Sequence, residues 1–162
     1  MCIVIDANTF HKMVDTNNED FTPLNNWIQN TDHKIIHGGS TYSKELLLHN
    51  DFRRYLKGLE RVGKTKEIET KQVDELEEKL KLYFINTAYD DHHLVAILFI
   101  SGCKLVCSHD KGFHKLIKDC CSDTGKRKII RKTSVKQISK VKIYQNKNHS
   151  DMLTTELDPC CV

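Results

Sequence analysis

Four carboxylates occupy positions from which they could form one site: Asp6, Glu45, Asp91 and Asp110. Asp6 directly follows a short apolar run rich in β-branched residues, and Asp110 is the third residue after another short apolar run. Such runs are typical of buried strands. Clustered carboxylates repel one another unless a cation lies between them. Because hard oxygen ligands suit Mg²⁺ and Mn²⁺, this set indicates a metal site that could activate water and stabilise charge on a phosphate.

The elements that must position these acids alternate along the chain. Strands are predicted at 2–5, 34–36, 104–107 and 128–131. Helices are predicted at 9–13, 21–28, from a cap at Ser40 or Ser43 toward Gly58, and at 73–82, 94–100 and 110–117. Short apolar strands that alternate with amphipathic helices favour a three-layer α/β/α fold with a mainly parallel central sheet.

The chain length fits a single domain, predicted at 1–145, followed by a flexible tail at 146–162 that lacks periodicity. In parallel sheets with helices on both faces, functional groups collect beyond the carboxyl ends of the strands. We therefore expect Asp6, Asp91 and Asp110 at one edge of the sheet, with Glu45 leaning into the same cleft from its helix.

Simpler roles compete with the metal site. Asp91 and Asp110 could each be an ordinary helix N-cap, a common position for aspartate. Four histidines flank the proposed site and could form a zinc site with Asp91 or Asp110: His92, His93, His109 and His114. None of their spacings matches a familiar zinc motif, so these histidines are predicted to be polar positions beside the cleft.

Three segments together resemble a known family. Residues 2–8 (CIVIDAN), 91–102 (DHHLVAILFISG) and 104–113 (KLVCSHDKGF) resemble the opening strand, the Asp-x-x-hydrophobic-x-Ala helix and the following Ser/Thr-x-Asp strand end of PIN domains. Glu45 best matches the glutamate of the family's central helix, with Glu60, Glu67 and Glu69 as alternatives in what is read as the helical middle. Asp90, beside Asp91, is an accessory ligand candidate.

The resemblance implies a PIN-like α/β/α endoribonuclease that hydrolyses RNA with Mg²⁺ or Mn²⁺. Its catalytic residues would be Asp6, Glu45, Asp91 and Asp110, with the three aspartates as metal ligands. Asn8 and Ser108 would contact substrate. Many relatives are toxins of bacterial toxin–antitoxin pairs, which adds an antitoxin-like protein and a homodimer to the expected partners.

Basic residues are concentrated in segment 126–147, which holds nine of them and no acidic residue. The rest of the chain carries 16 basic and 22 acidic residues, although the whole chain has a net charge of +3. Such asymmetry is typical either of a polyanion-binding surface or of a solvated charged face. In the first interpretation, four residues would bind RNA phosphates: Arg127, Lys128, Arg131 and Lys132.

Other classes fit less well. A haloacid-dehalogenase phosphatase needs a second carboxylate two residues after the first, where this chain has Asn8. A dinucleotide-binding domain needs a glycine-rich loop after its first strand, and no glycine is present there. A catalytically silent RNA- or protein-binding module on the same fold remains the alternative.

Composition indicates where the protein works. Apolar residues make up 39% and charged residues 29% of the chain, which is ordinary for a globular protein. We find neither an apolar stretch of membrane-spanning length nor a basic leader before Asp6, so no membrane contact and a cytoplasmic location are expected. The seven cysteines are odd in number and poorly spaced for disulfides, which favours reduced thiols.

Overall fold

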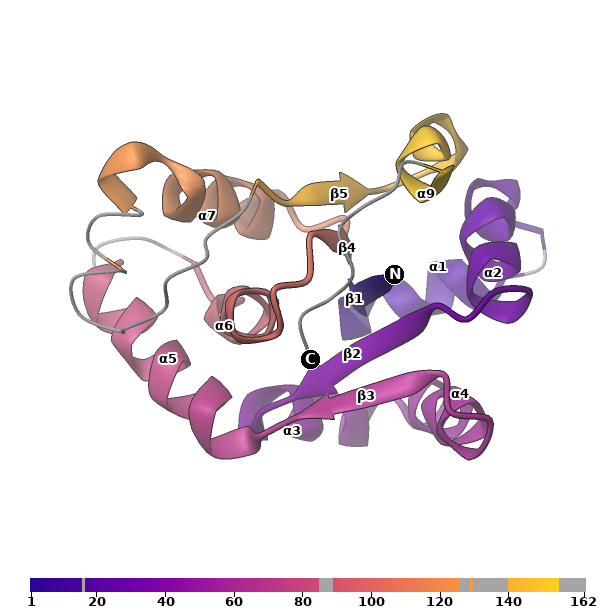
Figure 1. Cartoon of the computed structure of the whole chain (residues 1–162), viewed down its shortest axis with the longest axis horizontal. Helices are drawn as coiled ribbons and strands as arrows, with labels where there is room; N and C mark the ends of the chain where they lie inside the picture. The colour runs from indigo at the N-terminus through magenta and orange to yellow at the C-terminus, as the bar shows by residue number, and fades with distance from the viewer. Residues whose placement is uncertain (16, 85–88, 126–128, 130–139, 155–162) are drawn as a thin grey trace.

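The computed structural model describes residues 1–15, 17–84, 89–125, 129 and 140–154. Within this part of the chain, a five-stranded sheet has the order β3-β2-β1-β4-β5 (Figure 1). Its strands are β1 Cys2–Ile5, β2 Lys34–Gly38, β3 Thr65–Ile68, β4 Leu105–Cys107 and β5 Lys142–Tyr144. Every neighbouring pair is parallel. The predicted α/β fold class is confirmed.

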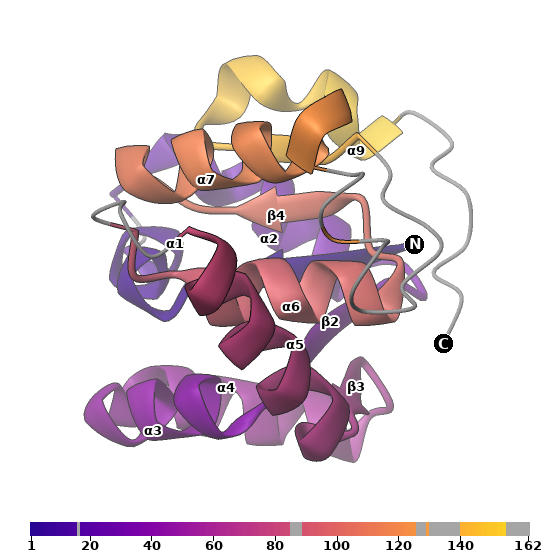
Figure 2. The ribbon, with the colours of Figure 1, turned by 90° about the vertical axis from the view of Figure 1, so that its left-hand side faces the viewer.

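Helices cover both faces of the sheet and complete the three layers. They are α1 Phe10–Val14, α2 Thr22–Gln29, α3 Ser40–Leu48, α4 Asn50–Arg61, α5 Thr70–Tyr83, α6 His92–Ser101, α7 Lys111–Cys121 and α9 Asp151–Thr154. Short 3₁₀ helices are η1 Ala7–Thr9, η2 Glu19–Phe21 and η3 Lys147–His149. Helices α5, α6 and α7 lie on one side of the sheet, and α1, α2 and α4 lie on the other (Figures 1 and 2).

Helix α6 is the centre of the core on its side of the sheet. Its residues from Leu94 to Phe99 are all buried, and it packs against α5 and against β1, β2 and β3. A helix that is apolar on every side must be enclosed by other elements, which explains this position. Because α6 is held so firmly, residues at its first turn have fixed positions relative to the strand ends.

Two elements differ from the prediction. No strand was predicted at β3, and Glu67 was placed in the helical middle of the chain. The β3 sequence TKEI instead forms a strand at the edge of the sheet, where three of its four residues stay partly or fully exposed. The helix predicted to run toward Gly58 is interrupted at His49, whose backbone (φ −117°, ψ 73°) is not helical. Tertiary packing decides both features, since neither has a strong local signal.

The C-terminal part of the chain also differs from the prediction. The strand predicted at 128–131 lies outside the described residues apart from Ile129, and the last strand is β5. Instead of a loose tail beginning near Asn146, residues 147–154 form η3 and α9. The indole Nε1 of Trp27 donates a 2.9 Å hydrogen bond to the Leu153 carbonyl oxygen, which fixes this segment against α2.

The direction of the connections reverses between β1 and β4. The chain moves from β1 to β2 to β3 toward one edge, then crosses back to place β4 and β5 on the other side of β1. Ligands of open parallel sheets bind beyond the carboxyl ends of the strands at such a reversal. Asp6 and Ser108 stand directly after these two strands.

Among the described helices, none is long and apolar enough to cross a membrane.

Candidate active site

Asp6 is a buried carboxylate at the end of the central strand. Its Oδ1 accepts a 2.9 Å hydrogen bond from the backbone N–H of Asn8, and its Oδ2 accepts one of 2.8 Å from the hydroxyl of Ser108. Only 2% of Asp6 is exposed. Burial raises the pKa of Asp6, the two hydrogen bonds oppose this, and the negative charge of Glu45 adds to the rise. Asp6 is therefore held in one orientation and favours a nearby cation.

Asp110 opens α7 and is tied to Asp6 through Ser108. The Ser108 hydroxyl oxygen accepts a 3.1 Å hydrogen bond from the Asp110 backbone N–H while it donates to Asp6. One Asp110 oxygen accepts a 2.6 Å hydrogen bond from the Phe113 N–H, so Asp110 is an N-cap, as the simpler role requires. A carboxylate has a second oxygen, so capping leaves a ligand atom.

Asp91 occupies the N-cap position of α6 but makes no capping hydrogen bond with its side chain. It is 8% exposed. Burial raises the pKa of Asp91 to about 7, with further contributions from the negative charges of Asp6, Asp90 and Asp110, while His93 opposes the rise. For Asp91 the N-cap explanation fails, and its charge is coupled to the other acids.

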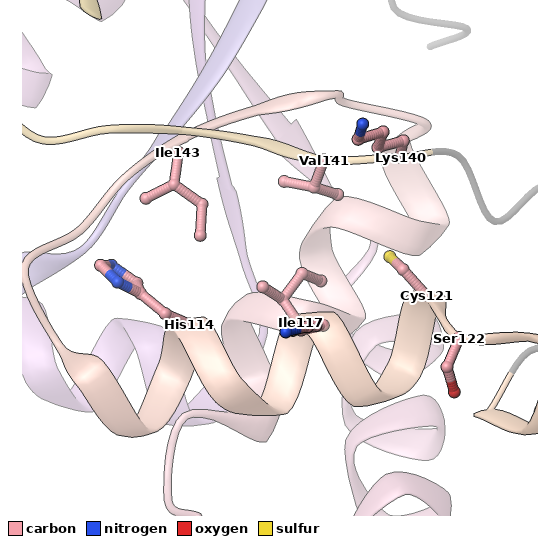
Figure 3. Close-up of a pocket in the computed structure, with 8 residues that line it drawn as sticks. His114, Ile117, Cys121, Ser122, Lys140, Val141 and Ile143 are labelled. Atoms are coloured by element: carbon pink, nitrogen blue, oxygen red, sulfur yellow. The ribbon is translucent and has the colours of Figure 1, made fainter.

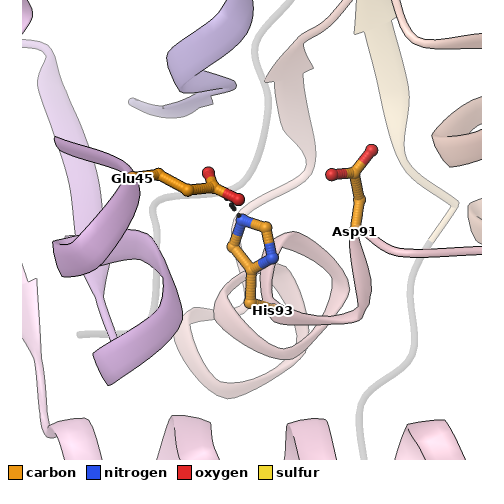
Figure 4. A group of neighbouring side chains, drawn as sticks. All are labelled: Glu45, Asp91 and His93. Carbon is orange, nitrogen blue, oxygen red and sulfur yellow. Dashed lines mark ion pairs between the residues drawn. The ribbon is translucent and has the colours of Figure 1, made fainter. Parts of the chain in front are cut away.

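Glu45 reaches the same place from α3 and meets His93 from α6 (Figure 4). The Glu45 Oε2 and His93 Nε2 atoms lie 3.2 Å apart. Burial lowers the pKa of His93, but the carboxylates of Glu45 and Asp91 outweigh it and raise this pKa above its ordinary value. Ligand atoms of Glu45, Asp91 and His93 all lie within 4.8 Å of one another. We call Asp6, Glu45, Asp91 and Asp110 the acidic cluster.

The position of α3, and with it Glu45, depends on contacts with α5. Gly39 precedes α3 with φ 86°, and a Cβ there would lie 2.6 Å from Val73 Cγ1. The Asp74 carboxylate accepts hydrogen bonds of 2.7 Å from the Ser40 N–H and 2.6 Å from the Ser40 hydroxyl. The cap predicted at Ser40 or Ser43 is thus wrong: α5 supplies the acceptor instead of a serine side chain.

The histidines differ most from the prediction. His92 and His93 are 3% and 1% exposed, so they belong to the interior and not to a polar rim beside the cleft. His114 Nε2 lies 2.9 Å from the Ser108 carbonyl oxygen, and His109 packs its ring 5.5 Å from that of Phe21. The sequence offered His93 as a zinc ligand beside Asp91 or Asp110 but not as a partner of Glu45, because Glu45 is far away in the chain.

Glu77 is a second residue without a sequence signal. It is 2% exposed, and its two oxygens each lie 2.9 Å from the Thr41 hydroxyl, which donates to them. Lys81 Nζ lies 2.8 Å from Glu77 Oε1. These contacts join α3 to α5 behind Glu45 and account for the buried charge of Glu77 without a metal.

Residues predicted to bind substrate fall into three groups. Arg127, Lys128, Arg131 and Lys132 lie outside the described residues. Asn8 is exposed next to Asp6, as a substrate contact requires. Ser108 is fully buried and is used to orient Asp6.

A mainly apolar pocket of about 550 Å³ lies between α7 and β5 (Figure 3). Its lining includes Ile117, Val141 and Ile143, with Lys140 at its margin. No member of the acidic cluster lines this pocket. The chemistry suggested by the acids therefore belongs to the strand ends and not to this hollow.

Among the described residues, potential ligand atoms gather at Glu45, Asp91 and His93, whereas Asp6 and Asp110 are joined to each other through Ser108 and act on Asp91 by their charge. No protein-family model matches the chain, and a search of curated proteins finds no match. The geometry at the ends of β1 and β4 is therefore the basis for a functional assignment.

Proposed function

We propose that this protein is a metal-dependent ribonuclease of the PIN type, which hydrolyses phosphodiester bonds of RNA at the acidic cluster. One observation carries the proposal: Glu45 and Asp91 gather with His93, and Asp6 and Asp110, which Ser108 joins at the ends of β1 and β4, act on Asp91 by their charge. Asp91 interacts electrostatically with Asp6 and Asp110, and Asp6 interacts with Glu45. This is the edge at which parallel α/β folds bind ligands.

A divalent cation fits the residues present. Asp91 has a pKa of about 7, which reflects the cost of ionising a buried carboxyl among other acids. Mg²⁺ or Mn²⁺ held by Asp6, Asp91 and Asp110 would remove that cost. When bound, the ion would supply an activated water and neutralise charge that develops on the phosphate.

The chain's own residues would fix the ligands before substrate arrives. Ser108 holds one oxygen of Asp6, and the Phe113 N–H holds one oxygen of Asp110. Ligands with restricted orientation lose little freedom in the reaction, which is the main advantage of a preorganised site. Glu45 would stand on the α3 side as a further charge.

RNA would approach this edge with its phosphates near basic residues. The expected contacts are Asn8 beside Asp6 and the basic segment 126–147. Because phosphate contacts carry no sequence information, binding through this segment would be general for RNA. The family resemblance extends the proposal to a cytoplasmic toxin that pairs with an antitoxin-like protein or forms a homodimer.

The proposal is tested by incubating the full chain with single-stranded RNA in Mn²⁺, Mg²⁺ or EDTA. We expect internal cleavage with a divalent ion and none in EDTA. A parallel reaction with p-nitrophenyl phosphate tests for a phosphatase and should give no product. Binding of RNA with no cleavage under any metal condition would instead support the silent binding module.

A further inference from the structure

His93 places a nitrogen donor inside the acidic cluster. Its side chain is 1% exposed, and its ring lies between the carboxylates of Glu45 and Asp91 (Figure 4). Nε2 lies 3.2 Å from Glu45 Oε2. Among the described residues, neither ring nitrogen of His93 has a hydrogen-bond partner, although Nε2 faces Glu45; both ring nitrogens of the adjacent His92 also have none. A buried polar atom without a hydrogen-bond partner costs free energy. A metal ion bound to the His93 imidazole would offset that cost.

The spacing of these groups is close to that of a metal site. The candidate ligand atoms of Glu45, Asp91 and His93 lie within 4.8 Å of one another. Two ligands on opposite sides of a small divalent ion, each about 2.1 Å from it, are about 4.2 Å apart. Only one pair of ligands in such a trio can be opposite, and adjacent ligands are about 3.0 Å apart. Glu45 Oε2 and His93 Nε2, at 3.2 Å, already have the spacing of adjacent ligands, and a movement of Asp91 by less than about 2 Å would complete the set.

We propose that His93 is a direct metal ligand, together with Glu45 and Asp91, and that this mixed nitrogen and oxygen site selects Mn²⁺ over Mg²⁺. Mg²⁺ prefers oxygen ligands and water, whereas imidazole favours transition-metal ions. The inference rests on the proposed function because it specifies the ion used at the same cluster. It assigns Glu45 to the metal, while the resemblance implies only the three aspartates as ligands.

The neighbouring histidine provides a matched control. His92 is also buried, at 3% exposed, and follows Asp91 directly in the chain. Its ring packs near Phe84 on the α5 side, with centroids 6.5 Å apart, and it is not one of the residues whose ligand atoms gather with Asp91. His92→Gln and His93→Gln thus remove the same chemical group from adjacent buried positions.

The test is pulsed electron paramagnetic resonance of the full-length protein loaded with Mn²⁺ in a nitrogen-free buffer. Wild type and His92→Gln should both show coupling between Mn²⁺ and a nitrogen nucleus, and His93→Gln should lose it. Labelling wild type with ¹⁵N-histidine should change the coupling from that of ¹⁴N to that of ¹⁵N, which tests the ligand even if His93→Gln does not fold. Absence of nitrogen coupling in wild type would overturn the assignment.

Calorimetry measures the selectivity of the site for Mn²⁺ over Mg²⁺. Mn²⁺ affinity should fall at least about tenfold in His93→Gln with little change for Mg²⁺, while His92→Gln keeps the wild-type ratio. An unchanged ratio in His93→Gln would overturn the proposal. RNA cleavage in Mn²⁺ without nitrogen coupling would leave the ribonuclease standing and remove His93 from the site. Nitrogen coupling without RNA cleavage would keep His93 as a metal ligand and remove the ribonuclease assignment.

Discussion

The hydroxyl of Ser108 donates a 2.8 Å hydrogen bond to Asp6 Oδ2 and so joins the ends of the two central strands, β4 and β1. The same oxygen accepts the backbone N–H of Asp110. One buried hydroxyl therefore sets both the orientation of Asp6 and the start of α7, where Asp110 stands.

Removal of this hydroxyl should weaken metal binding at the proposed site. In Ser108→Ala, Asp6 loses a hydrogen bond to its charged form, so its pKa should rise further and Mn²⁺ affinity should fall about tenfold or more. Stability should fall by about 1–3 kcal/mol. Calorimetric titration with Mn²⁺ and urea unfolding measure the two effects.

Ser101→Ala is the matched control. Ser101 is also fully buried, donates to the Ile97 carbonyl oxygen at 2.6 Å and accepts the Cys103 N–H at 3.1 Å. It lies at the far end of α6 from Asp91. Its loss should cost similar stability with unchanged metal affinity. Equal Mn²⁺ affinity in the two alanine variants would show that Ser108 does not support the site.

The acidic cluster predicts how stability depends on pH in metal-free protein. The pKa of Asp91 is about 7 when folded, above the ordinary 3.8. The folded state therefore binds the Asp91 proton more tightly than the unfolded state does. The stability that this proton contributes is fully present below about pH 4 and is lost as pH rises through about 7. The pKa values of Asp6 and His93 are raised as well, so they act in the same direction.

Urea unfolding in EDTA between pH 5 and 8 measures this effect. Asp91→Asn should become increasingly more stable than wild type as pH rises through this range. The difference should be at most about 4 kcal/mol, the equivalent of a pKa of about 7 against 3.8. Mn²⁺ at pH 8 should stabilise wild type more than the variant. A constant difference between the two proteins across this range would refute the electrostatic coupling.

Gly39 should be required for the position of α3. It has φ 86°, and a Cβ would lie 2.6 Å from Val73 Cγ1, so Gly39→Ala combines backbone strain with a clash. We expect a loss of more than about 1 kcal/mol. Gly58→Ala, on α4 with no atom within 4 Å of the added Cβ, should stabilise by about 0.5–1 kcal/mol. Thermal unfolding that ranks Gly39→Ala at or above wild type would contradict the described packing.

The basic segment should govern the salt dependence of RNA binding. Replacement of Arg127, Lys128, Arg131 and Lys132 by Gln should flatten the slope of log affinity against log salt, because fewer counterions are released. A control variant removes four basic residues outside the basic segment, one at the start of β2 and three on α4: Lys34, Arg54, Lys57 and Arg61. It should keep the wild-type slope. Equal slopes in both variants would mean that segment 126–147 is a solvated face.

The sequence predicted the parts of this site that depend on local pattern. Asp6 and Asp110 could be placed because short β-branched runs mark where β1 and β4 end, and parallel strands share a carboxyl edge. The apolar stretch of α6 predicted a helix, and Asp91 could be placed because it stands at the start of that helix. The α/β fold class followed from the alternation of such runs with helices.

The remainder depends on contacts between distant residues. Glu45 is positioned by α5, through the bonds of Asp74 to Ser40, and this pairing has no local signature. His93 could not be recognised as a partner of Glu45 because the two lie on different helices. β3 was missed because an edge strand with polar residues lacks the apolar run on which strand prediction relies.

The central claim is that carboxylates at this edge hold a catalytic metal ion, and Asp110→Asn tests it most directly. Asparagine also caps helices, so the bond from the Phe113 N–H to residue 110 should survive, and stability should change little. The variant loses one charge of the proposed ligand set. Time courses on single-stranded RNA with Mn²⁺ should show cleavage reduced by orders of magnitude, with RNA binding retained. Equal cleavage by wild type and Asp110→Asn, purified in parallel, would contradict the assignment of the acidic cluster as the active site.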